Sequence, residues 1–386
     1  MTLLDAARDR LDAMVADART LIECESPSED QAAVARSADV TARVVGAVLG
    51  TAGLPAEPDR VDVDGAPHLR WTLGDGPRRV LLVCHHDTVW PVGTLERIPF
   101  SVVDGVMRGP GCFDMIVGTV QAAHAVALLA VDGGAGAVDG VTILVTADEE
   151  IGSPRSRALI EAEARQHEAA LVLEAAGPGG AVKTARKGVS WYEVEAVGRA
   201  AHSGLEPEKG VNAGVELSHQ ILALQSLADA ELGTTVTPTR GWIGTTGNTV
   251  PANARVNVDV RARTAAEQDR VDASLRALAP VLEGAQIVLH GDINRRPLER
   301  EMALPLFERA ARLAPEAGLD SIQEIAVGGA SDGNFTAGVG TPTLDGLGAV
   351  GGGAHAEDEH VLVDEIPGRT ALVALLIRDL VSEPTS

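Results

Sequence analysis

The sequence Val141-Thr142-Ile143-Leu144-Val145-Thr146-Ala147-Asp148-Glu149-Glu150 decides the fold, because an apolar run ends in consecutive acids. A short apolar run bounded by polar residues is typical of a strand buried on both faces of a sheet. In open α/β sheets, the carboxyl ends of the strands carry the ligand-binding residues. Neighbouring side chains on an extended backbone point in opposite directions, so one of Glu149 and Glu150 can bind a metal while the other transfers protons. Taken alone, such a pair is more often a solvated acidic turn, so its interpretation depends on the other motifs.

A second apolar run, Val80-Leu81-Leu82-Val83, leads into Cys84-His85-His86-Asp87-Thr88. His85 and Asp87 share one face of an extended chain, because residues two apart point the same way. Neutral imidazole is a good zinc ligand, and a carboxylate that accepts the other ring proton fixes its tautomer. We therefore expect His85 to bind a metal with Asp87 behind it, and His86 to point away.

Three further segments each present one metal-binding side chain at a strand end or in a glycine-shaped loop. They are Asp114 after Gly109-Pro110-Gly111-Cys112-Phe113, Glu174 after Leu171-Val172-Leu173, and His355 after Gly351-Gly352-Gly353-Ala354. Two histidines and three carboxylates suit a pair of divalent metals. The mixture of nitrogen and oxygen donors favours zinc, with cobalt or manganese as alternatives, over calcium or an iron–sulfur cluster. Spacing alone does not determine which of these ligands share a metal ion.

The order of the elements predicts an α/β fold. Strands are expected near 79–85, 141–147 and 169–174, with helices at about 117–131 and 154–167. Alternation of this kind is typical of a mostly parallel sheet with helices on both faces. Near the N-terminus, Ser28 and Gln31 match a capping box that would start a helix ending near Gly50.

From Lys187 onward the pattern changes to strand, helix, two strands, helix and strand. This is the β-α-β-β-α-β order of ferredoxin-like α+β domains. We expect this unit, residues 187–293, to interrupt a first domain made of residues 1–186 and 294–386.

Composition limits the classes of function. A chain of 386 residues is too long for one ordinary core and suggests two domains. The formal net charge is −23, with 32 Lys and Arg against 55 Asp and Glu, which argues against nucleic acid or an anionic membrane as a partner. Three cysteines, an odd number, imply no disulfide framework. The N-terminus matches an amphipathic helix and not a signal peptide, and no run reaches the length of a membrane helix. We expect a soluble, cytoplasmic protein.

The order and context of these elements resemble the M20 metallopeptidases, a family of zinc aminoacyl hydrolases. The resemblance runs from about Leu81 to His355, and Cys84-His85-His86-Asp87-Thr88-Val89 is similar to the family signature Gly-His-x-Asp-Thr-Val. Two further stretches resemble the glutamate carboxypeptidase branch: Trp90-Pro91-Val92-Gly93-Thr94-Leu95 and Arg108-Gly109-Pro110-Gly111-Cys112-Phe113-Asp114-Met115.

One position departs from the family pattern. The frequent sequence Asp-Met-Lys-Ala-Gly here reads Asp114-Met115-Ile116-Val117-Gly118, so Ile116 stands where a lysine is common. The metal ligands are intact, but the substrate assignment loses support.

The resemblance implies a role for each of the singled-out residues. His85 and Glu174 would hold one zinc, Glu150 and His355 the other, and Asp114 would bridge the two ions. Glu149 would be the general base, and Asp87 would support His85. Gly353, in the glycine run, is a candidate substrate-binding residue.

The resemblance also assigns the inserted unit as a lid and dimerisation domain of a homodimer. His202, in Gly198-Arg199-Ala200-Ala201-His202-Ser203-Gly204, is similar to a lid histidine that reaches the partner subunit's active site, where it would stabilise an oxyanion. Asn248 in Gly247-Asn248-Thr249-Val250-Pro251 and Arg261 in Asp259-Val260-Arg261 match lid motifs and would bind a substrate carboxylate. A structural salt bridge is the alternative for Arg261.

Three functions are compatible with the sequence. The first is a dizinc carboxypeptidase that removes a C-terminal residue, preferentially an acidic one, from a peptide or an N-acyl amino acid. The second is a related amidohydrolase, such as an N-acyl-amino-acid deacylase. The third is a non-catalytic protein that binds a metal or a small molecule. Glu149 together with five ligands argues against the third, whereas the first two share every residue named.

Overall fold

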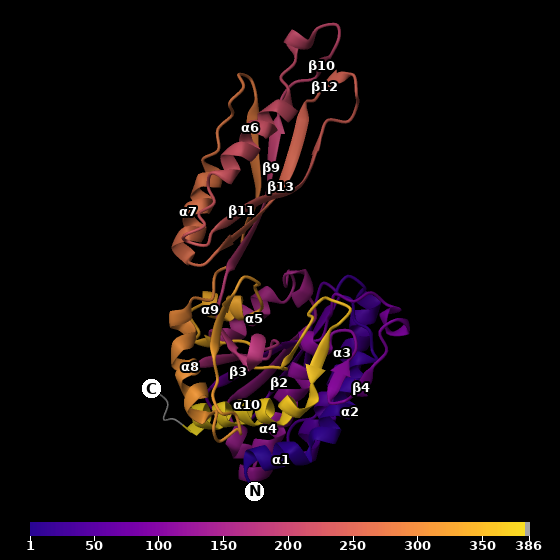
Figure 1. Cartoon of the computed structure of the whole chain (residues 1–386), viewed down its shortest axis with the longest axis vertical. Coiled ribbons are helices and arrows are strands. Elements are labelled where there is room, and N and C mark those ends of the chain that lie inside the picture. Colours follow the sequence, from indigo (N-terminus) through magenta and orange to yellow (C-terminus); the bar gives the residue numbers. More distant parts are fainter. Residues whose placement is uncertain (383–386) are drawn as a thin grey trace. The chain divides into compact units, whose positions relative to one another are not determined.

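The structure, a computed structural model, describes residues 1–382, which form two compact units. The first unit consists of Met1–Ala185, Arg300–Val327 and the chain from Ser331 onward (Figure 1). The second consists of Arg186–Glu299 together with Gly328–Ala330. The sequence predicts that the second unit spans residues 187–293. In the structure its main segment spans residues 186–299.

A six-stranded sheet forms the centre of the first unit, in the order β1-β2-β6-β3-β7-β16. Its strands are β1 (Asp59–Val63), β2 (Ala66–Thr72), β3 (Val80–His85), β6 (Val141–Thr146), β7 (Ala169–Val172) and β16 (Thr343–Leu344). The pairs β6–β3, β3–β7 and β7–β16 are parallel, whereas β1–β2 and β2–β6 are antiparallel. The expected α/β fold with a mostly parallel sheet is confirmed.

The hairpin of β1 and β2 was not expected from the sequence. It turns at Asp64 and Gly65, whose φ angles are 49° and 80°. Positive φ at both positions is the geometry of a two-residue hairpin turn, for which Asp-Gly is a favoured sequence. The sequence therefore contains the turn signal Asp64-Gly65, but the polar sequence of β1 does not identify it as a strand.

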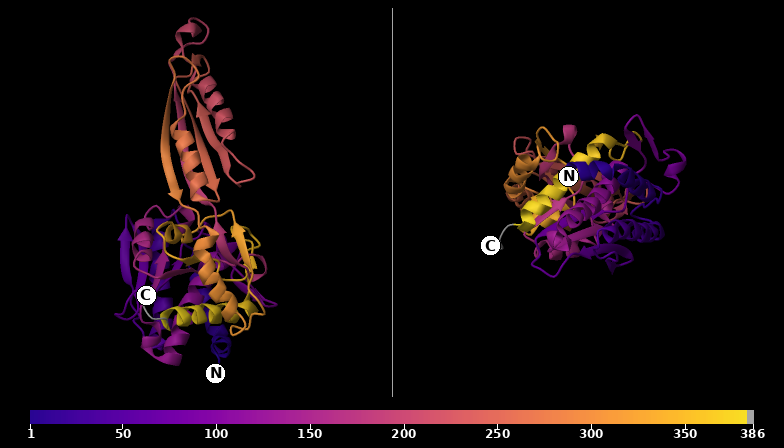
Figure 2. Two further views of the ribbon diagram at one scale, coloured as in Figure 1. Left: turned by 90° about the vertical axis from the view of Figure 1, so that its left-hand side faces the viewer. Right: turned by 90° about the horizontal axis from the view of Figure 1, so that it is seen from below.

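Helices cover both faces of this sheet. Every residue of β3, β6 and β7 is buried, which explains their near-continuous apolar sequences. Leu82 packs in a cluster with residues of α1 (Leu3–Asp9), α3 (Gln31–Thr51), α4 (Val117–Gly133), α8 (Arg300–Leu313) and α10 (Ile366–Ser382). Leu81, on the other face, packs with residues of α5 (Arg157–Ala164) and α9 (Gly333–Gly338). Figure 2 shows the yellow helix α10 from two further sides.

The N-terminal region differs from the expectation in two ways. The single amphipathic helix is divided into α1 and α2 (Leu11–Ile22). The capping box is wrong, because α3 begins at Gln31 with Asp30 as its N-cap, and the Asp30 carboxylate accepts from Ala33 N at 3.0 Å. Asp30 is directly before the helix, and its side chain reaches an N–H of the first turn. Ser28 instead donates its hydroxyl to Asp87 at 2.6 Å.

Within residues 1–382, one helical segment is long and apolar enough to cross a membrane, judged by its length and composition alone. This is Cys112–Gly133, with a mean hydropathy of 1.6 over an 18-residue window. Within the first unit, 89% of that window is buried, so it forms part of the core that packs on the sheet.

Two small sheets complete the first unit. One has the order β17-β18-β5-β4, and the other pairs β15 with β8. Their strands are β4 (Ser101–Val103), β5 (Val106–Arg108), β8 (Val182–Arg186), β15 (Glu324–Val327), β17 (Gly351–Gly352) and β18 (His360–Leu362).

The second unit is an antiparallel sheet with two helices on one face. Its elements in chain order are β9 (Gly188–Val197), α6 (Ala213–Gln225), β11 (Thr235–Ile243), β13 (Asn253–Ala262), α7 (Ala265–Arg276) and β14 (Gln286–Arg295). The sheet order β11-β13-β9-β14 has the first and third strands in the centre, as in ferredoxin-like folds. Leu217 of α6 and Val271 of α7 pack on Val194 and Val258 of the sheet. A short pair, β10 (Ala201–His202) and β12 (Thr249–Val250), lies outside this sheet.

Candidate metal centre

The singled-out residues of the first unit follow strand ends or lie in loops. His85 is the last residue of β3, Glu149 and Glu150 form a short helical turn after β6, and Glu174 follows β7. The strands β3 and β6 are parallel and in register, with His85 opposite Thr146. Their carboxyl ends therefore meet at one edge of the sheet.

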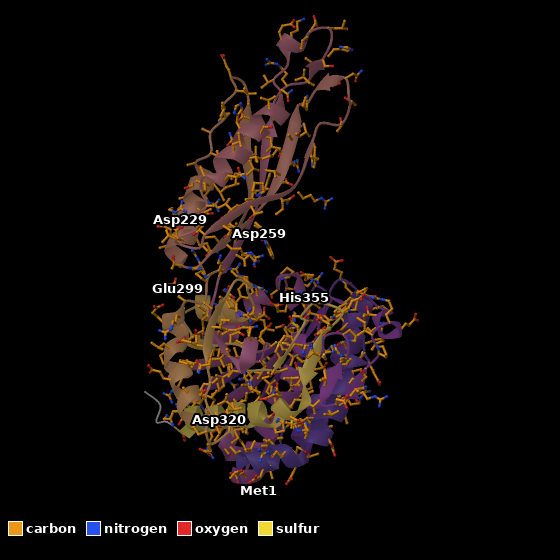
Figure 3. The ribbon with its side chains drawn as sticks, viewed as in Figure 1. Met1, Asp229, Asp259, Glu299, Asp320 and His355 are labelled. Carbon is orange, nitrogen blue, oxygen red and sulfur yellow. The ribbon has the colours of Figure 1, made fainter. Side chains whose placement is uncertain are left out.

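The two remaining candidates come from loops. Asp114 lies in the helical turn Cys112–Ile116, immediately before α4. His355 lies between β17 and β18 and has a φ of 62°, and Figure 3 labels it on the first unit. Gly353, two residues earlier, has a φ of 76°, and a Cβ there would lie 2.8 Å from Glu359 N. Glycine is therefore needed at 353 for the turn that carries His355. Substrate binding by Gly353 stays a prediction.

The structure brings the five proposed ligands together, with Asp114 between the two histidines. His85 Nε2 lies 3.4 Å from Asp114 Oδ1 and 3.6 Å from Glu174 Oε1. His355 Nε2 lies 3.4 Å from Asp114 Oδ2 and 3.1 Å from Glu150 Oε2. Each oxygen of the Asp114 carboxylate thus faces a different histidine. This is the arrangement that a carboxylate bridging two ions requires.

Two buried atoms of this cluster lack a hydrogen-bond partner, namely His85 Nε2 and Glu150 Oε1. A buried polar atom without a partner is costly in free energy, so such atoms call for a ligand or an ion. Ligand atoms of His85, Asp114 and Glu150 lie within 4.8 Å of one another, as do those of His85, Glu149 and Glu174. The donor set and its open atoms fit divalent metal ions such as zinc.

Charges within the cluster shift its pKa values strongly. Burial opposes ionisation of Asp114, but the neighbouring imidazoles of His355 and His85 outweigh it and hold the pKa of Asp114 well below its usual value. Hydrogen bonds to Asp114 and Glu150 raise the pKa of His355 to about 10. Burial raises the pKa of Glu150 to about 7. Burial opposes the charged form of His85, but the neighbouring carboxylates of Asp114, Asp87 and Glu174 outweigh it and raise the pKa of His85 well above 6.5. In the absence of metal, these shifts favour the doubly protonated, positively charged form of both imidazoles.

Asp87 supports the cluster through both its backbone and its side chain. Its carbonyl oxygen lies 2.9 Å from His85 Nδ1, whereas its carboxylate lies 3.5 Å from the same atom. The expectation that the carboxylate accepts the ring proton is corrected in this respect, because the carbonyl is the nearer acceptor. The carboxylate accepts the backbone N–H groups of Glu149 at 3.2 Å and Glu150 at 3.1 Å. Asp87 therefore fixes two strand ends at once.

His86 lies outside the cluster, as its position on the strand predicts. Its ring nitrogens lie 3.1 Å from Ser37 Oγ and 3.2 Å from Pro67 O. Burial lowers the pKa of His86 to about 4.

The departure at Ile116 has a structural explanation. Ile116 is buried in an apolar cluster that includes Leu21, Cys112 and Val117. An apolar side chain is therefore well accommodated there.

Gly118 lies near the start of α4. At Gly118 a Cβ would lie 2.0 Å from Leu173 O, so glycine permits the start of α4 to pack closely on the chain beside Glu174.

The three remaining predicted site residues lie in the second unit. His202 is exposed, and its Nδ1 accepts N–H groups of Gly204 at 3.1 Å and Leu205 at 3.2 Å. A nitrogen that accepts hydrogen bonds carries no proton, so the neutral ring carries its proton on Nε2. Asn248 is exposed, and its carbonyl accepts from Ser203 N at 3.1 Å.

Arg261 forms a two-point salt bridge in the structure. Its Nε and one terminal nitrogen lie 2.8 Å and 2.9 Å from the two carboxylate oxygens of Asp259. The alternative expectation of a salt bridge is therefore observed. Substrate binding by Arg261 and Asn248 stays a prediction.

Two buried residues close to the cluster were not singled out as site residues from the sequence. Ser28, which donates to Asp87, matches only a helix-capping pattern in the local sequence. Glu359 hydrogen-bonds the backbone of Asp114, and it lies in the acidic stretch Glu357-Asp358-Glu359, where a solvated surface is the ordinary expectation. No local pattern distinguishes Glu359 from its exposed neighbours.

Comparison with known proteins gives a consistent result. Residues 81–379 match the peptidase family M20/M25/M40. Carboxypeptidase G2 of Pseudomonas sp. (strain RS-16) is 32% identical over 319 residues, which cover 80% of this chain and 75% of that protein.

Solved structures share the fold at low sequence identity. The aminopeptidase PepT from Bacillus cereus has a TM-score of 0.71 at 20% identity, covering 96% of this chain and 98% of that one. The M20 family metallo-carboxypeptidase Sso-CP2 from Sulfolobus solfataricus has a TM-score of 0.69 at 16% identity, covering 96% and 99%.

The protonated histidines lead to a prediction about metal uptake. Metal-free protein should bind close to two equivalents of zinc and release protons, because His85 and His355 must deprotonate to act as ligands. The affinity should rise with pH, by roughly tenfold per pH unit for each proton displaced. Calorimetric titrations in buffers of different ionisation enthalpy measure both quantities. Binding without proton release would contradict the assignment of the two histidines.

Proposed function

The chain belongs to the peptidase family M20/M25/M40, and from this premise we propose a two-metal hydrolase that removes a C-terminal amino acid from a peptide or an N-acyl amino acid. A metal-dependent peptidase or hydrolase is what the family and the carboxypeptidase relative indicate. The observation that carries the finer proposal is the position of Asp114, with one oxygen toward each histidine.

In this proposal, His85 and Glu174 hold one zinc, Glu150 and His355 hold the other, and Asp114 bridges them. Cobalt or manganese are the alternative metals for such a donor set. When bound, the ions would lower the pKa of a water molecule and polarise the substrate carbonyl. The distances between the Asp114 carboxylate and the two histidines support this division of ligands.

Glu149 is proposed as the general base. Its side chain is buried, and one of its carboxylate oxygens lies within 4.8 Å of ligand atoms of His85 and Glu174. From this position the carboxylate would accept a proton from the attacking water and return it to the leaving nitrogen. Its backbone N–H is held by Asp87, which limits the movement of the side chain that transfers the proton. The same distances would also suit Glu149 as a metal ligand, so a test must separate the two roles.

A preference for an acidic C-terminal residue rests on the resemblance to the glutamate carboxypeptidase branch. Arg261 is the proposed partner of a substrate carboxylate, since its planar fork binds carboxylates at two points. It already holds Asp259 in this way, so a substrate carboxylate would have to replace or share that partner. Deacylation of N-acyl amino acids is the alternative, and it uses the same metal ligands and base.

A substrate panel tests this proposal. The zinc-loaded protein should hydrolyse dipeptides and N-acyl amino acids that end in glutamate or aspartate faster than matched substrates that end in alanine or lysine. The released amino acid can be measured by chromatography. Faster hydrolysis of N-acetyl amino acids without regard to the C-terminal side chain would instead favour the deacylase.

Glu149→Gln is the matched catalytic control for this panel. The amide keeps the size of the side chain but cannot accept the proton, so kcat should fall by roughly 10² or more. Metal content, measured by atomic emission, should stay at the wild-type level. An unchanged kcat would remove Glu149 as the base, and a loss of metal together with activity would make it a ligand.

We propose further that the protein is a homodimer formed through the second unit. The edge strand β11 carries Trp242 and Ile243, which are 46% and 56% exposed, and Leu222 of α6 is 67% exposed. Exposed apolar side chains on an unpaired sheet edge are typical of an interaction surface. A second copy of the chain would cover them.

In such a dimer, His202 would stabilise the oxyanion in the partner subunit's site. The tautomer described above leaves Nε2–H as a donor, which is the form an oxyanion requires. We also propose a cytoplasmic location. The three cysteines are free, and free cysteines are usual in the reducing cytosol.

Mixing two inactive variants tests the proposed action between subunits. Glu149→Gln and His202→Ala subunits should each be nearly inactive, the second by roughly 10² to 10³ in kcat. After subunit exchange, a hybrid dimer would contain one site with both residues intact, so part of the activity should return. Exchange can be followed by mass spectrometry of differently labelled subunits. Exchange without any recovery of activity would show that His202 acts within its own chain or not at all.

A further inference from the structure

Two motifs of the sequence have no part in the metal cluster itself, namely Trp90 and the turn Gly109-Pro110-Gly111. The structure connects both to one side chain, Glu359, which is only 1% exposed. Trp90 Nε1 donates to Glu359 Oε2 at 2.7 Å, and Gly111 N donates to the same oxygen at 2.9 Å. The other oxygen, Oε1, accepts from Phe113 N at 2.9 Å and Asp114 N at 3.1 Å.

An ionised carboxylate can accept about four hydrogen bonds, and the Glu359 carboxylate accepts four. Each oxygen of Glu359 receives two N–H groups, and three of the four belong to the backbone of one short segment. Backbone N–H groups of one short segment that converge on one anion form a concave binding site. Here the anion is a side chain of the protein, supplied from a position 245 residues away from Asp114.

The segment that Glu359 binds has an irregular backbone, which explains why an external acceptor is needed. Gly111 has a φ of 73°, and a Cβ there would lie 2.5 Å from Thr88 Cγ2. Asp114 is non-helical, with φ −118° and ψ 97°, although it lies in a helical turn. A segment outside regular structure cannot satisfy its N–H groups within one helix or sheet. The Glu359 carboxylate satisfies three of them and thereby fixes the backbone from which the Asp114 side chain extends.

Glu359 also belongs to the loop that carries His355. Its own N–H donates to Ala356 O at 2.9 Å, and Gly353 packs closely against its backbone. The side chain thus ties the loop of one proposed ligand, His355, to the loop of another, Asp114.

From this geometry we propose that Glu359 is a positioning residue that sets where Asp114 lies between His85 and His355, with Trp90 holding the Glu359 carboxylate in place. The inference rests on the proposed function, because it assigns Asp114 to the metals. The hydrogen bonds of Glu359 go to the Trp90 side chain and to the backbone of the 111–114 segment, so Glu359 acts on the cluster through the position of Asp114. Its effect is on how tightly the preformed cluster binds metal.

The test is the zinc affinity of purified variants, measured by competition with a chromophoric chelator. Glu359→Gln replaces one acceptor oxygen by an NH₂ group that faces N–H donors, so the segment should shift. The zinc affinity should fall by roughly 10- to 100-fold, the usual effect of losing a group that orients a metal ligand. Glu357→Gln is the matched control, since Glu357 is an exposed carboxylate in the same loop, and its affinity should equal that of the wild type.

Trp90→Phe is a second variant, which keeps the inference testable if Glu359→Gln does not fold. It keeps an aromatic ring and removes only the N–H that donates to Glu359, so the zinc affinity should fall less than in Glu359→Gln. Circular dichroism of the metal-free proteins reports whether each variant is folded. If Glu359→Gln does not fold, the affinity of Trp90→Phe decides.

The outcomes separate this inference from the proposed function. If the wild type binds no zinc, the proposed function fails, and the assignment of Glu359 fails with it. If the wild type binds zinc and folded Glu359→Gln binds it equally well, only the positioning role is overturned. Loss of affinity in Glu359→Gln and Trp90→Phe, but not in Glu357→Gln, supports it.

Discussion

The interaction on which the rest of the site depends is the placement of Asp114 between His85 and His355. Its two carboxylate oxygens each lie 3.4 Å from one imidazole, so the two halves of the cluster share this single side chain. The imidazoles of His355 and His85 hold the pKa of Asp114 low despite its burial, and Asp114 together with Glu150 raises the pKa of His355 to about 10. The metal-free cluster therefore places acidic and basic side chains next to one another around the positions that metal ions would take.

Three separate sets of contacts hold this arrangement, and they involve Asp87, Gly118 and Glu359. The parallel strands β3 and β6 deliver His85 and the Glu149–Glu150 pair to one sheet edge, and Asp87 joins those two strand ends through its carbonyl and its carboxylate. Gly118 lets the chain beyond Asp114 pack against Leu173, beside Glu174. Glu359 satisfies the irregular backbone before Asp114. The Asp87 carboxylate, Gly118 and Glu359 all act on the backbone around the cluster, whereas the Asp87 carbonyl contacts the His85 ring directly.

Much of this could be predicted from the sequence, for a physical reason. Strands buried on both faces have continuous apolar sequences, so β3 and β6 and the polar residues that follow them stand out. What could not be predicted depends on contacts between distant residues. Ser28 was interpreted from its nearest neighbours and in fact donates to Asp87, and Glu359 was indistinguishable from exposed acids beside it. The choice between the carbonyl and the carboxylate of Asp87 as partner of His85 depends on local backbone geometry that a residue pattern does not contain.

The most direct measurement of the central claim is anomalous diffraction at the zinc absorption edge from crystals of the zinc-loaded protein. The account predicts two anomalous peaks on opposite sides of the Asp114 carboxylate, one next to His85 and Glu174 and the other next to Glu150 and His355. A single peak, or peaks that do not contact Asp114, would contradict it.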